Sequence, residues 1–122
     1  MELLDTTVLV DLLRKNAAAV AWLRSTTGKP AVSVISLTEL YAGARSRREE
    51  QELLALERSF RILNLDRDIA VRAGVFVRLY GASHNIDDPD AIIAATADHH
   101  GLALATLNVK HFPMFPKLKR PY

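Results

Sequence analysis

Short apolar segments alternate with helix-forming segments along the whole chain, and this alternation constrains the fold more than any other feature of the sequence. The expected strands cover residues 3–4, 31–35, 60–65 and 102–105, with two helical segments between each strand and the next. Strands connected through helices run parallel in one sheet, because each crossover returns the chain to the same edge. The sequence therefore predicts an α/β fold of three layers, in which helices cover both faces of a parallel sheet of four to five strands.

The length and composition predict a single globular domain that covers residues 1–122. Apolar residues make up 49% and charged residues 25%, which excludes a disordered class. No apolar run is long enough to cross a membrane and no secretory signal precedes the domain, so we expect a cytoplasmic protein with no membrane partner. The chain has no cysteine, which excludes disulfides, zinc-thiolate sites and cysteine nucleophiles.

Turn and capping residues predict where the helices begin and end. Thr6 or the threonine after it is expected to cap the first helix. The motif at Ser36–Glu39 has the spacing of a capping box, which would begin a helix there and give its glutamate a purely structural explanation. Asp88 is expected to cap the helix that ends at Gly101, and Gly81 is expected to end the helix before it.

Three carboxylates, Asp5, Glu39 and Asp90, follow the predicted strands or lie in the helix turns just after them. The polar loop from Thr106 to Asn108 follows the last strand. Because the carboxyl ends of parallel strands meet at one edge of a sheet, we expect these side chains to lie together. Their mutual repulsion favours a bound cation, and oxygen ligands suit Mg²⁺ or Mn²⁺. Mg²⁺ bridges carboxylates to phosphates, so the expected substrate is a phosphate ester.

Other classes of phosphate-handling protein lack their signatures in this chain. An aspartyl-nucleophile phosphatase needs a second acid two residues after the first, where this chain has Thr7. A receiver domain needs an early pair of acids, and only Asp5 is early. The five glycines form neither a phosphate-binding loop nor a dinucleotide-binding motif.

Four segments carry a resemblance to a known family. They are LLDTTVLVDLL, SVISLTELYAGA, DDPDAIIAATADHHGLALATLNVKHF and the closing PY. In their order and spacing, these segments resemble the PIN-domain ribonucleases, specifically the VapC-type toxins of toxin–antitoxin pairs, over nearly the whole chain. The resemblance implies a metal-dependent endoribonuclease that hydrolyses RNA phosphodiester bonds. The acids that match the family motifs, and that would be catalytic, are Asp5, Glu39 and Asp90.

The resemblance also implies a cofactor and partners. Asp5 and Asp90 would hold Mg²⁺ or Mn²⁺, with Glu39 and Asn108 as further candidate ligands. RNA would be the substrate, and a small antitoxin protein would lay an apolar, basic segment across the acidic groove. The toxin would pair as a homodimer and form a larger assembly with its antitoxin.

Two threonines and two departures from the family pattern bear on this site. Thr6 and Thr106 are placed to hydrogen-bond the acids, and turn or cap roles explain both threonines equally well. Many family members have Asp where this chain has Asn108, and often an acid where it has His111. Asn108 can offer a carbonyl oxygen to a cation but no charge, which leaves open a second metal ion and the role of His111.

Basic residues are the candidates for RNA contact. The segment from Lys110 onward has four basic residues and no acid, interleaved with aromatic residues that suit stacked bases. A solvated tail with its aromatic rings docked on the domain is the simpler interpretation. The full set of candidates is Arg14, Lys15, Arg45, Lys110, Lys117, Lys119 and Arg120.

Two alternative functions share the predicted fold. A PIN-like nuclease could serve general RNA processing or DNA flap cleavage without an antitoxin. A catalytically weakened RNA-binding module would keep the core and lose carboxylates, as at Asn108. Metal-dependent cleavage of RNA separates the module from a nuclease, and a neighbouring small reading frame separates the processing enzyme from a toxin.

Overall fold

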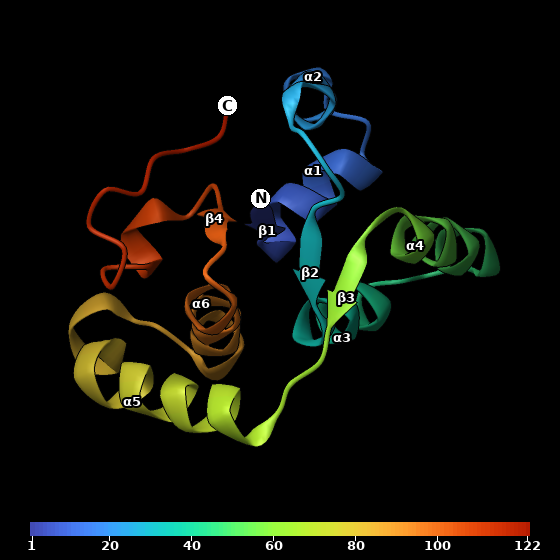
Figure 1. Ribbon diagram of the computed structural model, residues 1–122. Helices are drawn as coiled ribbons and strands as arrows, with labels where there is room; N and C mark the ends of the chain where they lie inside the picture. Colours follow the sequence, from blue (N-terminus) through green and yellow to red (C-terminus); the bar gives the residue numbers. More distant parts are fainter.

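Four parallel strands form the centre of the computed structural model, which describes all 122 residues (Figure 1). The strand order is β3-β2-β1-β4, so β1 lies between β2 and β4. In chain order, the elements are β1 (Glu2–Leu4), α1 (Thr6–Leu13), α2 (Ala17–Ser25), β2 (Ala31–Ser33), α3 (Val34–Ala42), α4 (Arg47–Ser59), β3 (Arg61–Leu63), α5 (Arg67–His84), α6 (Asp88–His100), β4 (Ala103–Ala105) and a 3₁₀ helix (Val109–His111). The predicted α/β class and the predicted order of elements are confirmed, and the sheet has four strands, not five.

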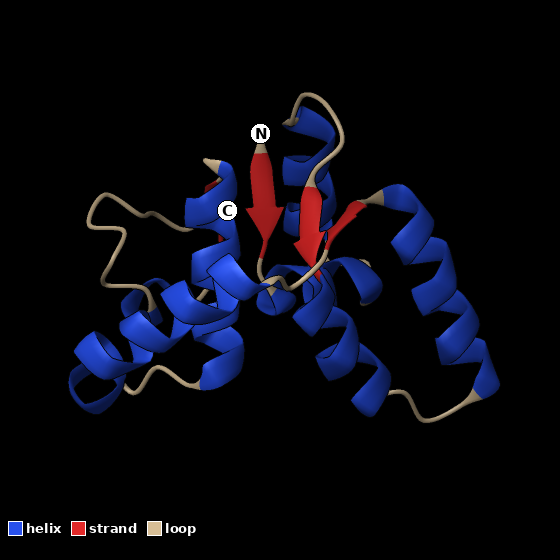
Figure 2. Ribbon diagram, turned by 60° about the horizontal axis from the view of Figure 1, so that its bottom comes forward, coloured by secondary structure: helices blue, strands red, loops and turns tan.

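The strands β1, β2 and β4 have buried residues on both faces, because successive side chains point to opposite sides of the sheet. The residues paired across β2, β1 and β4 form two sets, Ala31, Leu3 and Leu104, and Val32, Leu4 and Ala105. The first set packs against α6, and the second packs against α1, α3 and α4. Figure 2 shows the strands between these two groups of helices. This burial on both faces explains why consecutive residues of these strands are apolar.

The helix α6 is buried between the sheet and α5. Its residues Ile93, Ala94 and Ala97 belong to the core beneath the sheet, whereas Ala91 and Ala95 pack in a third cluster with residues of α5. This burial on opposite sides fixes the position of α6 and of the acids in its first turn. No helix of the protein combines the length and the apolar character that a membrane span requires.

The helices α1 and α3 begin earlier than the sequence predicted. Asp5, not Thr6, caps α1, since its Oδ1 accepts from the N–H of Thr6 at 2.8 Å. Ser33 caps α3, so the strand expected over residues 31–35 ends there and Val34 begins the helix. The capping box predicted at Ser36–Glu39 is therefore wrong. Its glutamate lies in the second turn of α3, where no capping role explains it.

The ends of α5 and α6 also differ from the prediction in part. Asp87, not Asp88, caps α6 by accepting from the N–H of Asp90 at 3.0 Å. The helix α5 continues through Gly81 to His84, and Asn85 ends it in the left-handed region with φ 55°. A glycine inside a helix costs about 1 kcal/mol, which the packing of α5 on α6 offsets. Gly101 ends α6 as predicted.

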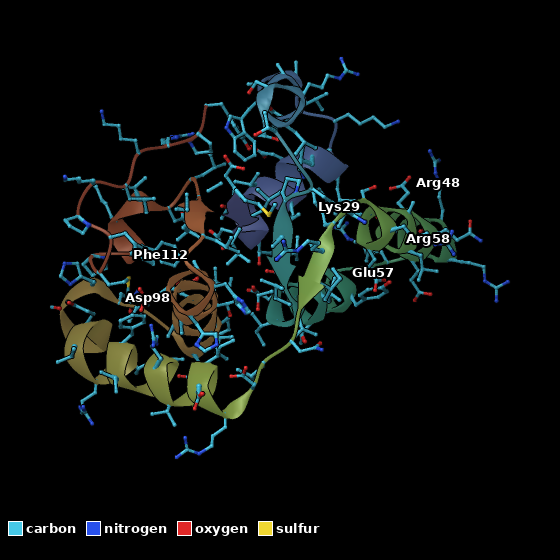
Figure 3. All side chains as sticks on the ribbon, in the orientation of Figure 1. Lys29, Arg48, Glu57, Arg58, Asp98 and Phe112 are labelled. Atoms are coloured by element: carbon cyan, nitrogen blue, oxygen red, sulfur yellow. The ribbon has the colours of Figure 1, made fainter.

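The C-terminal segment folds back over the domain, as the interpretation of docked aromatic rings predicted. Phe112 is 1% exposed and packs with residues of α6 and β4 (Figure 3). The ring of Tyr122 lies 6.2 Å from that of Trp22, and its hydroxyl donates to Asp11 Oδ2 at 2.9 Å. Burial and this hydrogen bond raise the pKa of Tyr122. The three basic residues between Phe112 and Tyr122 are exposed.

Two glycines allow a matched test of how the backbone conformation of a residue affects the stability of the fold. A Cβ at Gly101 or at Gly74 would meet no atom within 4 Å, but only Gly101 has a positive φ, of 64°. Gly101→Ala should lower the free energy of unfolding by about 1 kcal/mol, because an L-residue is strained in that region. Gly74→Ala, inside α5, should raise it by about 1 kcal/mol through helix propensity. Denaturant unfolding of both variants checks these opposite signs, and equal signs would contradict the assignment of the α6 end.

Candidate active site

Asp5 lies at the carboxyl end of β1 and is 3% exposed. Its N–H donates to the carbonyl of Ala105 at 2.9 Å, which extends the pairing of β1 with β4 by one residue. Its Oδ1 accepts from the N–H of Thr6 at 2.8 Å, and its Oδ2 accepts from the hydroxyls of Thr7 at 3.0 Å and Thr106 at 2.6 Å. Three hydrogen bonds therefore fix this carboxylate, and it forms no ion pair with a lysine or arginine.

Glu39 is held beside Asp5 through Thr6. The Thr6 hydroxyl donates to Glu39 Oε1 at 2.7 Å and is hydrogen-bonded to Ser36 Oγ at 2.9 Å. Ser36 is fully buried in α3, whereas Glu39 is exposed one turn further along. Because Thr6 follows Asp5 directly, these contacts bring the α3 carboxylate to the end of β1.

Asp90 lies in the first turn of α6, and its side chain is 21% exposed. Burial, followed by repulsion from Asp87 and Asp5, raises the pKa of Asp90 to about 6. His111 opposes this shift, since its Nδ1 lies 3.4 Å from Asp90 Oδ2. Because the charge of Asp5 is among the causes of this shift, the two carboxylates lie within electrostatic range of each other.

In the turn after β4, the side chain of Thr106 forms a hydrogen bond with an acid of the site, and the side chain of Asn108 does not. Thr106 is fully buried, and its hydroxyl donates to Asp5 and accepts from the N–H of Asn108 at 3.0 Å. Asn108 is exposed, and its side chain forms no hydrogen bond. The Nδ1 atom of His111 is buried and has no hydrogen-bond partner. In the segment after β4, His111 therefore contacts the acid Asp90, and Asn108 contacts no acid.

The donor set fits a hard cation such as Mg²⁺. None of the three carboxylates is paired with a lysine or arginine, and repulsion from Asp87 and Asp5 adds to the effect of burial in raising the pKa of Asp90. Asp5 Oδ1 accepts one hydrogen bond and has a further lone pair for a ligand. No group of three or more histidine, aspartate or glutamate side chains is arranged so that it could hold a metal ion by itself. Water and substrate oxygens would therefore complete the coordination, as is usual for Mg²⁺.

The predicted RNA-contact residues are exposed but fall in different places. Arg14 and Arg45 line a cavity of about 430 Å³ together with Glu39. Lys110 lines a larger cavity of about 590 Å³ together with His111. The remaining candidates, which lie outside these two cavities, are Lys15, Lys117, Lys119 and Arg120.

Sequence reasoning missed three polar contacts of the site. Thr7 was noted only as a possible cap, although its hydroxyl binds Asp5. Ser36 was placed at a helix start, and nothing in the local sequence indicates its bond to Thr6. The contact between His111 and Asp90 depends on how the segment after β4 returns to α6.

Comparison with known proteins identifies the fold family, since residues 3–116 match the PIN domain. This chain belongs to the PIN-domain family. The PIN domain is 50% identical to Ribonuclease VapC10 of Mycobacterium tuberculosis, over all of this chain and 93% of the relative. It is 44% identical to Ribonuclease VapC19 of the same species, over the full length of both. The family predicted from the sequence is therefore confirmed.

Solved structures agree with this assignment. A toxin–antitoxin complex from Klebsiella pneumoniae contains a chain that is 34% identical to this PIN domain, with a TM-score of 0.86 and coverage of 100% of this chain and 98% of that one. FitAcB from Neisseria gonorrhoeae matches with a TM-score of 0.72 and 34% identity, over 92% of this chain and 91% of that one.

The raised pKa of Asp90 predicts a pH-dependent stability. A carboxyl with a pKa near 6 in the folded state and near 4 in the unfolded state destabilises the fold increasingly as the pH rises through this window. Asp90→Asn should therefore raise the free energy of unfolding at pH 8, by about 1 kcal/mol after allowance for solvent screening, and should have little effect at pH 4. Denaturant unfolding in the presence of a chelator measures this difference.

The matched control for this prediction is Asp88→Asn, which removes a charge from an exposed position in the same helix turn. This variant loses a favourable interaction with the helix dipole and should not stabilise the protein at pH 8. A gain for Asp88→Asn equal to that for Asp90→Asn would mean that general charge reduction, not the burial of Asp90, is the cause.

Proposed function

We propose that this PIN domain is a ribonuclease of the VapC type that hydrolyses phosphodiester bonds of RNA with the help of Mg²⁺ or Mn²⁺. The observation that carries the proposal is the buried carboxylate of Asp5, which three hydrogen bonds orient and no basic side chain neutralises. The names of the two relatives from Mycobacterium tuberculosis support ribonuclease activity.

The proposed mechanism assigns a separate role to each acid. A bound Mg²⁺ or Mn²⁺ would polarise the scissile phosphate and lower the pKa of the attacking water. Asp5 and Asp90 would hold this ion, and the hydroxyls of Thr7 and Thr106 keep the Asp5 carboxylate in one orientation without reorganisation during the reaction. Glu39, whose position is set by Thr6, would accept a proton from the attacking water.

We also propose an antitoxin protein as the partner of this PIN domain. The cavity beside Glu39 contains Glu49 and Glu52 over an apolar floor that includes Leu40 and Leu53, and its three glutamates outnumber its two arginines. Such a surface suits a segment with basic and apolar side chains, which would cover Glu39 and so block the site. The structural relative from Klebsiella pneumoniae is a toxin–antitoxin complex, which supports this assignment. A homodimer of the toxin, and a larger assembly with the antitoxin, belong to the same proposal.

One observation favours a second candidate, an RNA-binding module without cleavage. Asn108 brings no charge to the site and its side chain forms no hydrogen bond. The three acids that match the family motifs remain in this chain, so we favour the nuclease.

Loss of either aspartate tests the nuclease. Asp5→Asn and Asp90→Asn should each reduce metal-dependent RNA cleavage by more than about a hundredfold while the fold is retained, because each change removes a charge that holds the cation. Cleavage of a labelled RNA with Mg²⁺, with Mn²⁺ and with a chelator measures the effect, and circular dichroism checks the fold. Asp98→Asn, at the opposite end of α6, is the control and should keep full activity. Cleavage at the full rate in excess chelator would contradict the role of the metal ion.

Asn108→Asp tests whether the side chain at this position lies in the metal site, beside those of the three acids. An added negative charge there should lower the melting temperature without metal and increase the stabilisation by Mg²⁺ or Mn²⁺, mainly at low metal concentration. A thermal-melt titration with each ion measures both effects. Asn64→Asp, at the end of the edge strand β3, adds the same charge away from β1 and should leave the metal-dependent shift unchanged. An unchanged shift for Asn108→Asp would place Asn108 outside the metal site.

A further inference from the structure

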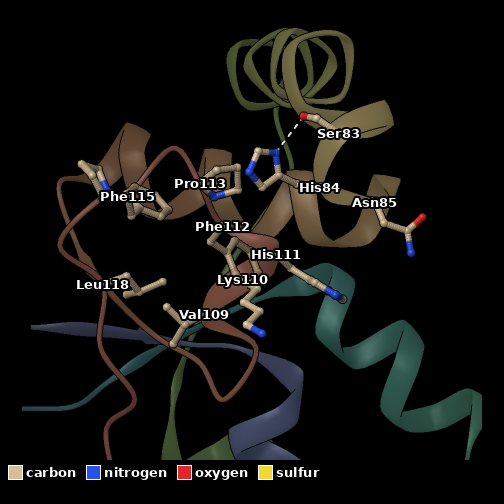
Figure 4. Close-up of a pocket in the computed structure, with 11 residues that line it drawn as sticks. Ser83, His84, Asn85, Val109, Lys110, His111, Phe112, Pro113, Phe115 and Leu118 are labelled. Carbon is tan, nitrogen blue, oxygen red and sulfur yellow. Dashed lines mark hydrogen bonds between the residues drawn. The ribbon is translucent and has the colours of Figure 1, made fainter.

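A cavity of about 590 Å³ lies next to the acids and has no role in the mechanism above. One wall is the end of α5, Ser83–Asn85, and the other is the segment Val109–Pro113 together with Phe115, Pro116 and Leu118 (Figure 4). Its volume lies within the range of small-ligand sites, which is about 300–1,000 Å³. His111 lines this cavity and also contacts Asp90, so a molecule bound here lies one side chain away from the acids.

The chemistry of the cavity differs from that of the cavity beside Glu39. None of its eleven lining residues is an acid, although the chain contains fourteen acids. Lys110 supplies positive charge, His84 and His111 supply ring nitrogens, and the side chains of Phe115 and Leu118 supply an apolar wall. The cavity beside Glu39, in contrast, contains three glutamates together with Arg14 and Arg45. The two cavities therefore differ in charge, and the larger one, which has no acid in its lining, suits a phosphate-bearing ligand better.

His84 provides a flat, exposed side chain on the α5 wall. Its Nδ1 lies 2.8 Å from Ser83 Oγ, and its ring packs edge-on against Tyr80 with the centroids 6.0 Å apart. These two contacts limit the rotation of the imidazole. Figure 4 shows the imidazole on the side of α5 and Phe115 on the side of the C-terminal segment. Unpaired bases bind between such flat and apolar groups by stacking.

A basic surface continues from the cavity along the C-terminal segment. Lys117 and Lys119 line a neighbouring cavity that shares Phe115, Pro116 and Leu118 with the first. Both lysines are exposed. A nucleic-acid backbone that leaves the cavity in this direction meets positive charge, which favours RNA over a basic protein segment as the occupant.

From these observations we infer that the cavity between the end of α5 and the segment 109–118 is a subsite for one unpaired nucleotide of the RNA, beside the phosphate that is cleaved. The base lies between His84 and the apolar wall, and Lys110 contacts the backbone. The inference rests on the proposed ribonuclease function and adds a requirement for single-stranded RNA at the cleavage site. It also gives this cavity a role in the choice of substrate.

Binding of short RNA tests the subsite. All proteins carry Asp5→Asn to prevent cleavage, and the probe is a fluorescein-labelled unstructured RNA of about ten nucleotides, with a hairpin duplex for comparison. His84→Ala should weaken binding of the unstructured RNA about fivefold to tenfold, the lower part of the range for loss of one stacked base. His99→Ala, which removes an exposed histidine at the far end of α6, should change neither the affinity for the unstructured RNA nor that for the hairpin.

An abasic scan separates a base-binding subsite from general attraction to phosphates. One nucleotide at a time is replaced by an abasic residue, and each RNA is titrated against the protein with and without His84→Ala. At one position, loss of the base should weaken binding to the protein with His84 and should cause no further loss in the His84→Ala variant, because the two changes remove the same contact. Additive losses at every position would overturn the inference.

Two further outcomes distinguish this inference from the function on which it rests. If the protein without substitutions cleaves RNA with Mg²⁺ but the scan shows no coupling to His84, the subsite is wrong and the nuclease stands. If His84→Ala weakens binding of a partner antitoxin and not of RNA, the cavity is a protein-binding site and the inference is overturned. If the protein neither cleaves nor binds any RNA, the proposed function fails and the inference fails with it.

Discussion

The buried carboxylate of Asp5 is the interaction on which the site depends. Asp5 lies at the end of the central strand β1 and caps α1. Its carboxylate accepts hydrogen bonds from the hydroxyl of Thr7 and from that of Thr106, which follows β4. An unpaired buried polar group costs free energy, so these bonds stabilise the folded chain as well as orient the carboxylate. Because the same contacts join β1, α1 and β4, the fold and the position of this acid are determined together.

The rest of the site is arranged around this point by the packing of helices. Thr6, the first residue of α1, forms hydrogen bonds with Ser36 and Glu39 of α3. The helix α6 is held between the sheet and α5, and this packing positions Asp90 in its first turn. Burial is the main cause of the raised pKa of Asp90, and the repulsion from Asp87 and Asp5 that adds to it is a cost of this arrangement. A bound cation would remove that cost, which links the stability of the fold to the binding of metal.

The two cavities near the site differ in charge, and the two proposals assign a different partner to each. Three glutamates and two arginines line the cavity that contains Glu39, whereas basic, polar and apolar groups and no acid line the cavity that contains His111. Under these proposals, an inhibitory protein segment and an RNA chain would approach the acids from different sides. The site would then be blocked without competition for every contact that holds the RNA.

The sequence by itself determined the α/β class and the order of the elements, because strand and helix periodicity are local features. It also supplied Asp5, Glu39 and Asp90 as the candidate acids of the site, from strand-end positions and the family resemblance. The tertiary structure decided what these acids contact. The hydrogen bond between Thr6 and Glu39 and the contact of His111 with Asp90 both join residues that are distant in the chain. Such contacts form only when the helices pack on the sheet, and no local pattern encodes that packing.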